Sequence, residues 1–334
     1  MQMGARTAVS SAVTKVQLLG RNRERSRAEL KDGIANFYDK SSGLWESIWG
    51  EHMHHGYYEE QPQSLEEHKA AQVAMIDKSL EWAGVGVDAA STPKTGVDVG
   101  CGIGGSSRHI ARKWGTKMQG ITLSPKQCAR ANELAAEAGL ADKCSFQVAD
   151  ALEQPFEDNS FDLIWSMESG EHMPLKQQFV GELARVCAPG GRVLIVTWCH
   201  RDLEEGEESL KPKEQRLLAA INKAYYLPKW CSVADYVTYC QEAGLTDVRR
   251  DDWTDKIQYF WPAVIKSSLS GRGIRGLVRA GPGIIRGALA MLLMVRGFKL
   301  NLVKFGLITA RKPDDREAEP EPVLSPLSSS RMPY

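Results

Sequence analysis

The sequence lacks the features that would indicate a zinc site, a membrane span or bulk nucleic-acid binding. Its seven cysteines are scattered and none stands in a C-x-x-C pair, which excludes the usual zinc spacings and favours free thiols in a reducing compartment. The longest apolar candidate, ALAMLLMV from Ala288, is far shorter than the roughly 18 residues that a membrane-spanning helix needs. The formal net charge is zero, so we expect no nucleic-acid partner.

Short apolar runs alternate with amphipathic segments between Thr95 and Cys199. TGVDVG is followed by SSRHIARKWG, KMQGITL by SPKQCARANELAAEAG, and FDLIWSM by a helical pattern that ends at APGG (188–191), which we interpret as a stop and turn. This alternation indicates βαβ units and a parallel sheet covered on both faces. Two later strand candidates, LTDVRRDDW and LVKFGLITARK, would add an antiparallel hairpin.

A glycine-rich stretch, VDVGCGIGGSSRHIA from Val97, lies between a predicted strand and a predicted helix, which is where a glycine loop binds a nucleotide. Its glycines fit G-x-G-x-x-G, but dinucleotide sites place an acid about 20 residues further on, and here the second strand ends in GITLS without one. An acid, Asp98, instead precedes the first glycine. A carboxylate there suits the ammonium group of a methionyl ligand, which favours S-adenosylmethionine over a dinucleotide.

Four further stretches, SMESGEHMP, VTWCHRDL, YYLPKWCS and FWPAVIKSSL, are more specific than the loop. Together with it they resemble the gamma-tocopherol C-methyltransferase family of plastid enzymes, which has a close branch of alkaloid N-methyltransferases. The resemblance covers residues 28–313 approximately. It implies an α/β, Rossmann-like class I methyltransferase fold: a seven-stranded, mostly parallel sheet with an antiparallel last strand, an N-terminal helical lid, and a helical insertion before that strand.

The same resemblance implies an activity and a substrate. The expected reaction is S-adenosylmethionine-dependent C-methylation of the chromanol ring of gamma-tocopherol and delta-tocopherol, which gives alpha-tocopherol and beta-tocopherol in vitamin E biosynthesis. The alternative is N-methylation of an indole alkaloid. A rival of another class, a cofactor-binding protein without catalysis, would have a degraded glycine loop or no acid after the fourth strand. This sequence has an intact loop and an acid after that strand, which argues against the rival.

Cofactor contacts carried over from the family fall at the ends of the predicted strands. In the wider group a Thr-Leu pair and a glutamine on the next helix hold the ribose in place of the missing acid, and Thr122, Leu123 and Gln127 stand at those places. The glycine loop is expected to contact the methionine end of the cofactor. The end of the third strand would contact the adenine, and the end of the fourth would lie near the sulfur. The full expected set is Asp98, Gly100, Cys101, Gly102, Gly104, Thr122, Leu123, Gln127, Asp150, Ala151, Met167 and Glu168.

Two residues are candidates for the general base that a ring-carbon acceptor requires, because the phenol must lose its proton to raise the electron density of the ring. Glu171 follows the fourth strand, where lipid-methylating relatives have an active-site Glu-His pair; otherwise it would cap the next helix. His55 belongs to EHMHHGYY (51–58), part of a segment that in similar proteins closes over the methyl donor. The histidines at 52, 54 and 55 lack the i, i+4 spacing of a helical metal site, so we expect no metal. Which residue, Glu171 or His55, takes the proton stays open.

A basic, apolar stretch suits a membrane surface. From Lys266 to Lys304 there are eight Lys or Arg and no acid, a pattern typical of interfacial helices. Because tocopherol is lipid-like, we expect peripheral membrane contact through 261–304, with packing on the sheet as a lid as the other interpretation. The sequence does not give the oligomeric state.

The predicted organisation has three parts. Residues 1–27 hold six Lys or Arg and one acid, which is typical of a transit segment to the plastid or of a basic leader without function. The methyltransferase domain is expected at 28–312, divided into lid helices (28–94), a cofactor-binding core (95–199), and substrate-side helices with the last strands (200–312). The tail at 313–334, rich in Pro, Ser and Glu, is expected to be disordered.

Overall fold

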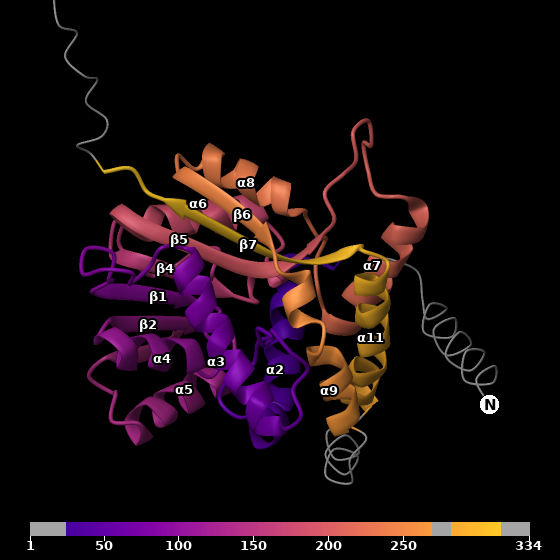
Figure 1. Ribbon diagram of the computed structural model, residues 1–334, viewed down its shortest axis with the longest axis horizontal. Coiled ribbons are helices and arrows are strands. Elements are labelled where there is room, and N and C mark those ends of the chain that lie inside the picture. Colours follow the sequence, from indigo (N-terminus) through magenta and orange to yellow (C-terminus); the bar gives the residue numbers. More distant parts are fainter. Residues whose placement is uncertain (1–24, 269–281, 315–334) are drawn as a thin grey trace, which may run out of the picture.

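The computed structural model describes residues 25–268 and 282–314, and a seven-stranded sheet lies at its centre (Figure 1). The strand order is β3-β2-β1-β4-β5-β7-β6. β7 runs antiparallel to both of its neighbours, whereas β1 to β5 pair in parallel. The strands are β1 (Thr95–Val99), β2 (Lys117–Thr122), β3 (Cys144–Val148), β4 (Phe161–Met167), β5 (Cys187–His200), β6 (Thr246–Asp252) and β7 (Val303–Arg311). The predicted α/β sheet with its antiparallel last strand is confirmed.

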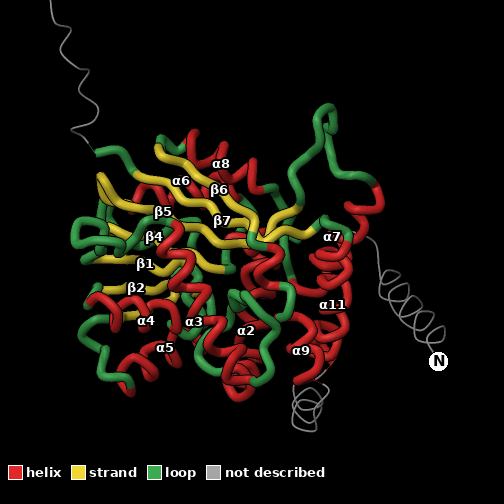
Figure 2. Tube along the Cα trace, in the orientation of Figure 1, coloured by secondary structure: helices red, strands yellow, loops and turns green. Residues whose placement is uncertain are grey.

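Helices cover both faces of the sheet (Figure 2). The first face carries α3 (Leu65–Trp82), α4 (Gly105–Trp114) and α5 (Pro125–Glu137), and the second carries α6 (Lys176–Val186) and α8 (Val233–Glu242). The sequence of β5 explains this arrangement, because Leu194 and Val196 join the core of one face while Val193 and Ile195 join that of the other. Successive side chains of a strand point to opposite faces, and a run that is apolar at every position is typical of a strand buried on both.

Four helices gather beyond the carboxyl ends of the parallel strands (Figure 1). They are α2 (Arg27–Trp49), α7 (Pro212–Tyr225), α9 (Phe260–Ser268) and α11 (Pro282–Lys299), and two short 3-10 turns, η1 (Gly170–His172) and η2 (Thr254–Ile257), complete the fold. These helices cover the edge of the sheet at which ligands bind in open α/β proteins.

The start of α2 is fixed by polar contacts. Ser26 accepts a hydrogen bond from the backbone N–H of Glu29, and the Glu29 carboxylate accepts one from the N–H of Ser26, which together form a capping box. One residue earlier, the Arg25 guanidinium donates to the carbonyl oxygens of Asn222 and Lys223 at 2.9 and 3.0 Å. These contacts attach the first turn of α2 to the end of α7.

The segment at 188–191 differs from its predicted structure. α6 ends at Val186 as expected, but residues 188–191 belong to an irregular first part of β5 and do not form a free turn. The reason is that Gly190, with φ +76°, donates its N–H to the carbonyl of Lys312 at 2.9 Å, and Lys312 donates back to Gly191. The chain beyond β7 therefore holds this segment at the sheet.

Several sequence predictions lie wholly or partly outside the described residues: the leader up to residue 24, residues 269–281 of the basic stretch, and the tail from residue 315. Across 25–268 and 282–314, no helix combines the length and the apolarity needed to cross a bilayer. In the later part of α11, Ala290, Leu293 and Met294 are buried in the core. That face of the basic stretch packs on the protein.

Candidate active site

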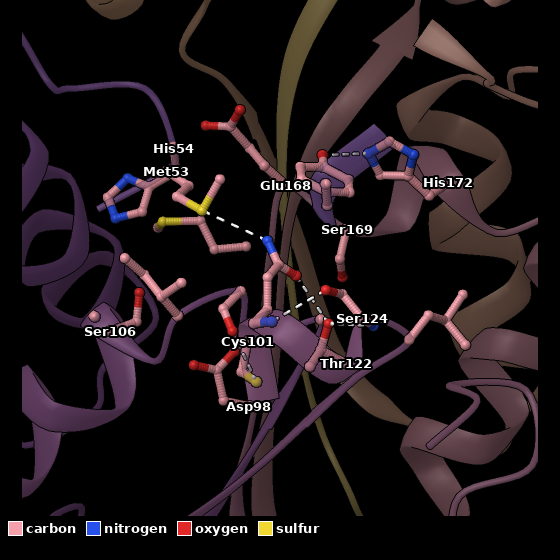
Figure 3. A pocket seen from close by; sticks show the side chains of 18 of the residues that line it. Met53, His54, Asp98, Cys101, Ser106, Thr122, Ser124, Glu168, Ser169 and His172 are labelled. Carbon is pink, nitrogen blue, oxygen red and sulfur yellow. Dashed lines mark hydrogen bonds between the residues drawn. The ribbon is translucent and has the colours of Figure 1, made fainter. Parts of the chain in front are cut away.

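A pocket lies at the carboxyl ends of β1, β2 and β4, with α2 and the segment after it forming its other side (Figure 3). In the view of Figure 3, Asp98 and Glu168 lie at opposite ends of the pocket, and Met53 and His54 lie along one side. The predicted cofactor residues that line it are Asp98, Gly100, Cys101, Gly102, Thr122, Leu123, Gln127, Met167 and Glu168. The structure therefore brings most of the predicted set together around one cavity.

Three predicted cofactor residues are not among those that line this pocket. Gly104, with φ +76°, is the N-cap of α4. A Cβ there would lie 2.5 Å from the Phe146 ring, so glycine is needed at this position because the helix packs closely on that ring. Ala151 is buried in the core. The Asp150 carboxylate pairs with Arg27 and Lys31 of α2 at 3.1 and 3.4 Å, so it connects α2 to the end of β3.

Asp98 is a buried carboxylate at the end of β1. Its Oδ2 accepts a hydrogen bond from the hydroxyl of Ser107 at 2.7 Å, and burial raises the pKa of Asp98 to about 7. No Lys or Arg within the described ranges forms an ion pair with it. Next to it, Gly102 has φ +54°, and a Cβ there would meet nothing closer than the Met53 sulfur at 3.7 Å. A positively charged ligand group beside Asp98, with the open glycine loop around it, fits the amino acid end of S-adenosylmethionine.

Gln127 joins the core to α2. Its Oε1 accepts from the Thr122 hydroxyl at 3.0 Å, and its Nε2 donates to the Ser42 hydroxyl of α2 at 3.1 Å. Ser124 caps α5 by accepting from the Gln127 N–H and also donates to Asp39 of α2. Sequence reasoning found Thr122 and Gln127 but missed Ser42 and Asp39, because no local pattern indicates which face of α2 meets this corner.

The Arg130–Glu46 ion pair, 2.8 Å between Nη2 and Oε1, also holds α2 to α5. A partly exposed pair contributes about 0.2–1 kcal/mol, so we expect Arg130→Gln to speed the release of S-adenosylhomocysteine by about 1.4- to fivefold. Displacement kinetics in a stopped-flow instrument measure this rate. Lys113→Gln, which breaks a pair with Asp77 away from α2, is the control and should leave the rate unchanged. Equal release rates in the two variants would show that the pair does not retain α2.

Glu168, at the end of β4, connects the pocket to the histidine segment. It has φ +51° and lines the pocket, and its carboxylate accepts from the backbone N–H of His55 at 2.5 Å and lies 2.7 Å from Nδ1 of the same residue. On η1, Nε2 of His172 lies 3.0 Å from the hydroxyl of Tyr38 on α2. Burial lowers the pKa of His172 to about 4, so this imidazole is neutral at physiological pH.

Glu171 lies behind the pocket and is not among the residues that line it. Its Oε2 accepts from the hydroxyl of Thr197 at 2.7 Å, and burial together with the charge of Glu168 raises the pKa of Glu171 to about 8. The capping alternative is wrong, because α6 begins at Lys176 without a side-chain cap.

The three histidines of EHMHHGYY lie in two different surroundings, the pocket and an aromatic cluster. His52 and His54 line the pocket, their ring centroids lie 5.3 Å apart, and burial lowers the pKa of both. His55 is not among the lining residues; it is 1% exposed, with its ring 4.0 Å from that of Phe260 and 5.3 Å from that of Trp261. The segment therefore contacts both the pocket and an aromatic cluster behind it.

Proteins of known family are similar to this chain in sequence. A family model described as a methyltransferase domain matches residues 97–195, from Asp98 and its glycine loop to the middle of β5. A protein of Oryza sativa subsp. japonica, named "Probable tocopherol O-methyltransferase, chloroplastic", is 60% identical over 286 residues, which are 85% of this chain and 79% of that one. The chain belongs to the tocopherol methyltransferase family.

As a member of the tocopherol methyltransferase family, the protein is an S-adenosylmethionine-dependent methyltransferase. A second member, the "Tocopherol O-methyltransferase, chloroplastic" of Arabidopsis thaliana, is 55% identical over 294 residues, 86% of this chain and 84% of that one. The solved structure of geranyl diphosphate C-methyltransferase from Streptomyces coelicolor A3(2) matches with a TM-score of 0.67 and 21% identity over 87% of this chain and 100% of that one. That likeness shows the shared fold. The predicted family, fold class and enzyme class are confirmed.

Proposed function

We propose that the protein transfers the methyl group of S-adenosylmethionine to a ring carbon of gamma-tocopherol and delta-tocopherol, in vitamin E biosynthesis. The observation that carries the proposal is the position of Glu168, whose carboxylate lies between the cofactor pocket and a buried cluster of aromatic rings. A flat, apolar chromanol suits such a cluster. The relatives' names add support for a tocopherol acceptor.

We propose the following roles for the predicted cofactor residues. Asp98 holds the ammonium group and the glycine loop the rest of the methionine part, while Thr122, Leu123 and Gln127 hold the ribose. Asp150 and Ala151 would contact the adenine from the neighbouring strand end. Bound there, S-adenosylmethionine supplies a methyl group on a sulfonium that is already activated. The chain's contribution is then mainly orientation, which for well-placed reactants reaches effective molarities on the order of 10⁵ M or more.

A location at a plastid membrane completes the proposal. The relatives are named chloroplastic, and the residues before α2 are basic. An acceptor with an isoprenoid tail partitions into lipid, and the basic stretch 261–304 would meet the membrane surface. Each basic residue near an anionic surface contributes about 1 kcal/mol, which gives weak and reversible attachment.

The test is to incubate the protein with methyl-labelled S-adenosylmethionine and, separately, gamma-tocopherol, delta-tocopherol and an indole alkaloid, and then to locate the label. We expect label on a ring carbon of both tocopherols. Label on the phenol oxygen would overturn the ring-carbon assignment, and label on nitrogen alone would establish the alkaloid alternative. Cofactor binding without any transfer would establish a binding protein without catalysis.

A further inference from the structure

Four buried rings surround the ring of His55, and the five together form one cluster. We call these residues the His55 ring cluster: His55, Trp198 of β5, Phe260 and Trp261 of α9, and Phe305 of β7. Each ring is no more than 9% exposed. The His55 ring centroid lies between 4.0 and 5.8 Å from the centroids of the other four. Segments from four distant parts of the chain thus meet around one imidazole.

Three ring nitrogens of this cluster have no hydrogen-bond partner among the described residues: Nε2 of His55, Nε1 of Trp198 and Nε1 of Trp261. Their rings lie close together, with centroids 5.8 Å apart for His55 and Trp198, 5.3 Å for His55 and Trp261, and 6.0 Å for the two indoles. Buried polar groups are normally hydrogen-bonded. Three unpaired nitrogens in one apolar cluster therefore point to a polar atom of a ligand.

Two neighbouring tryptophans differ from those of the cluster, although Nε1 of Trp165, outside the cluster, is also buried without a partner among the described residues. Trp230 stacks on Trp198, but its Nε1 donates to the side-chain oxygen of Asn222. Trp253 is also buried, and its Nε1 donates to the Asp251 carboxylate at 2.9 Å. The side chains of Asn222 and Asp251 therefore satisfy these two indoles, whereas no described residue accepts a hydrogen bond from Trp198 or Trp261.

Glu168 determines which nitrogen of His55 carries a proton. A carboxylate only accepts hydrogen bonds, so the 2.7 Å contact between Glu168 Oε2 and Nδ1 of His55 places the proton on Nδ1. The second contact, from the His55 backbone N–H to Oε1, fixes the carboxylate itself. Nε2 of His55 is then a free acceptor, which is the arrangement a general base needs.

We propose that His55, Trp198 and Trp261 bind the phenolic oxygen of the acceptor: Nε2 of His55 removes the phenol proton, and the two indole N–H groups donate to the oxygen. Glu168 acts as a positioning residue that orients His55. This inference rests on the proposed function and deepens it. It assigns the proton to His55 and not to Glu171, whose carboxyl is bonded to Thr197 behind the pocket.

The reaction balances with these groups and one water molecule. The phenol O–H bond breaks, its proton moves to Nε2 of His55, and the electron pair left on oxygen enriches the ring. A ring π pair then forms the new C–CH₃ bond while the S–CH₃ bond breaks and its pair stays on sulfur, which gives S-adenosylhomocysteine and a dienone. Water takes the ring proton, the C–H pair restores the aromatic ring, and the oxygen recovers its proton from His55. The products are the methylated phenol, S-adenosylhomocysteine and one proton.

The first experiment compares His55→Asn with Glu171→Gln in the full chain. Asparagine keeps an N–H near the position of Nδ1 for Glu168 but lacks Nε2, so we expect kcat on gamma-tocopherol to fall about 100-fold and the affinity for S-adenosylhomocysteine to change less than threefold. Glu171→Gln preserves a bond to Thr197 and should lower kcat less than fivefold. The opposite ranking would overturn the assignment to His55. If the wild-type protein methylates no phenol, the proposed function fails, which is a separate outcome.

The second experiment measures binding and does not depend on turnover. The probes are the tail-less chromanol of gamma-tocopherol and its methyl ether, titrated into protein saturated with S-adenosylhomocysteine. We expect the wild type to bind the phenol at least tenfold more tightly than the ether, because the ether has no proton for Nε2. His55→Asn should abolish this preference, and Trp198→Phe and Trp261→Phe should each reduce it severalfold. Trp253→Phe is the matched control and should keep it. Equal binding of the two probes by the wild type would refute the proposal.

The positioning role of Glu168 has its own measurement. Glu168→Gln can still accept from His55 but cannot stabilise the imidazolium, so kcat should fall at least tenfold while the KM for the chromanol changes less than threefold. Glu168→Asp should recover part of kcat. A rise in KM with kcat unchanged would mean that Glu168 only shapes the site.

Discussion

Asp98→Asn is expected to weaken the binding of S-adenosylmethionine by about 30-fold or more. The substitution keeps the shape of the side chain and a bond to Ser107, but removes the charge that we propose faces the ligand's ammonium group. Truncating one partner of a buried, hydrogen-bonded charge pair costs about 2–5 kcal/mol, and each 1.4 kcal/mol corresponds to about a factor of ten. Titration calorimetry at pH 8 gives the ratio directly, and a ratio below tenfold would rule out the proposed contact.

The pH dependence of the same interaction has a defined sign. Burial raises the pKa of Asp98 to about 7 in the ligand-free protein, so below pH 7 the carboxyl is largely neutral. Wild-type affinity for S-adenosylmethionine should therefore fall as the pH decreases from 8 to 6, and the affinity of Asp98→Asn should stay flat. Parallel pH profiles for the two proteins would show that another group titrates.

Stability without ligand follows from the same raised pKa. A carboxyl whose pKa is higher in the folded state than in the unfolded state contributes stability that is fully present below about pH 4 and is lost as the pH rises through about 7. At pH 8, ligand-free Asp98→Asn should therefore melt at a higher temperature than the wild type. With saturating S-adenosylmethionine the order should reverse.

Gly100→Ala is expected to lower the melting temperature by about 5–15 °C and to abolish cofactor binding. Gly100 has φ +86°, and a Cβ there would lie 2.2 Å from Cβ of Ser169. A left-handed alanine costs on the order of 1–2 kcal/mol, and overpacking typically adds about 1–3 kcal/mol; for a domain of this size each kcal/mol corresponds to about 2–4 °C. The displaced Ser169 is also a lining residue, so the pocket changes shape.

Gly115→Ala separates the two causes. Gly115 has a similar φ of +71°, but nothing lies within 4 Å of the position of its Cβ. It should show the backbone effect alone, a decrease of about 2–4 °C for each kcal/mol, with cofactor affinity unchanged. Scanning calorimetry and titration of both variants make the comparison. Equal losses in the two variants would mean that contact with Ser169 is unimportant.

The sheet and much of the pocket could be predicted because they depend on local patterns. Parallel strands place their carboxyl ends at one edge, so residues such as Asp98, Thr122 and Met167, far apart in sequence, were expected to meet there. The contributions of α2 were not predictable: the pairs Tyr38–His172 and Ser42–Gln127 join residues 134 and 85 positions apart. Their meeting depends on how α2 docks, which no periodicity in the sequence specifies.

The two candidate bases show the same limit. The sequence favoured Glu171, which follows a predicted strand end, kept His55 of the predicted lid as a competing base, and left the choice between them open. Their tertiary contacts distinguish them. Glu168, 113 positions from His55, hydrogen-bonds to Nδ1 of His55, and the hydroxyl of Thr197 donates to the carboxylate of Glu171. A titratable residue's partners and burial, and not its type, decide its protonation state.

The polar contacts at the start of α2 restrict where the basic leader could be removed. Ser26 caps the helix, Arg25 bonds the end of α7 and packs 4.6 Å from the Tyr226 ring, and Arg27 pairs with Asp150. A processing protease that cut after Arg27 would remove all three contacts and fray the helix that roofs the pocket. Residues 25–27, the last three of the predicted leader, therefore belong to the folded domain, and any cleavage of the leader that preserves these contacts must fall upstream of Arg25.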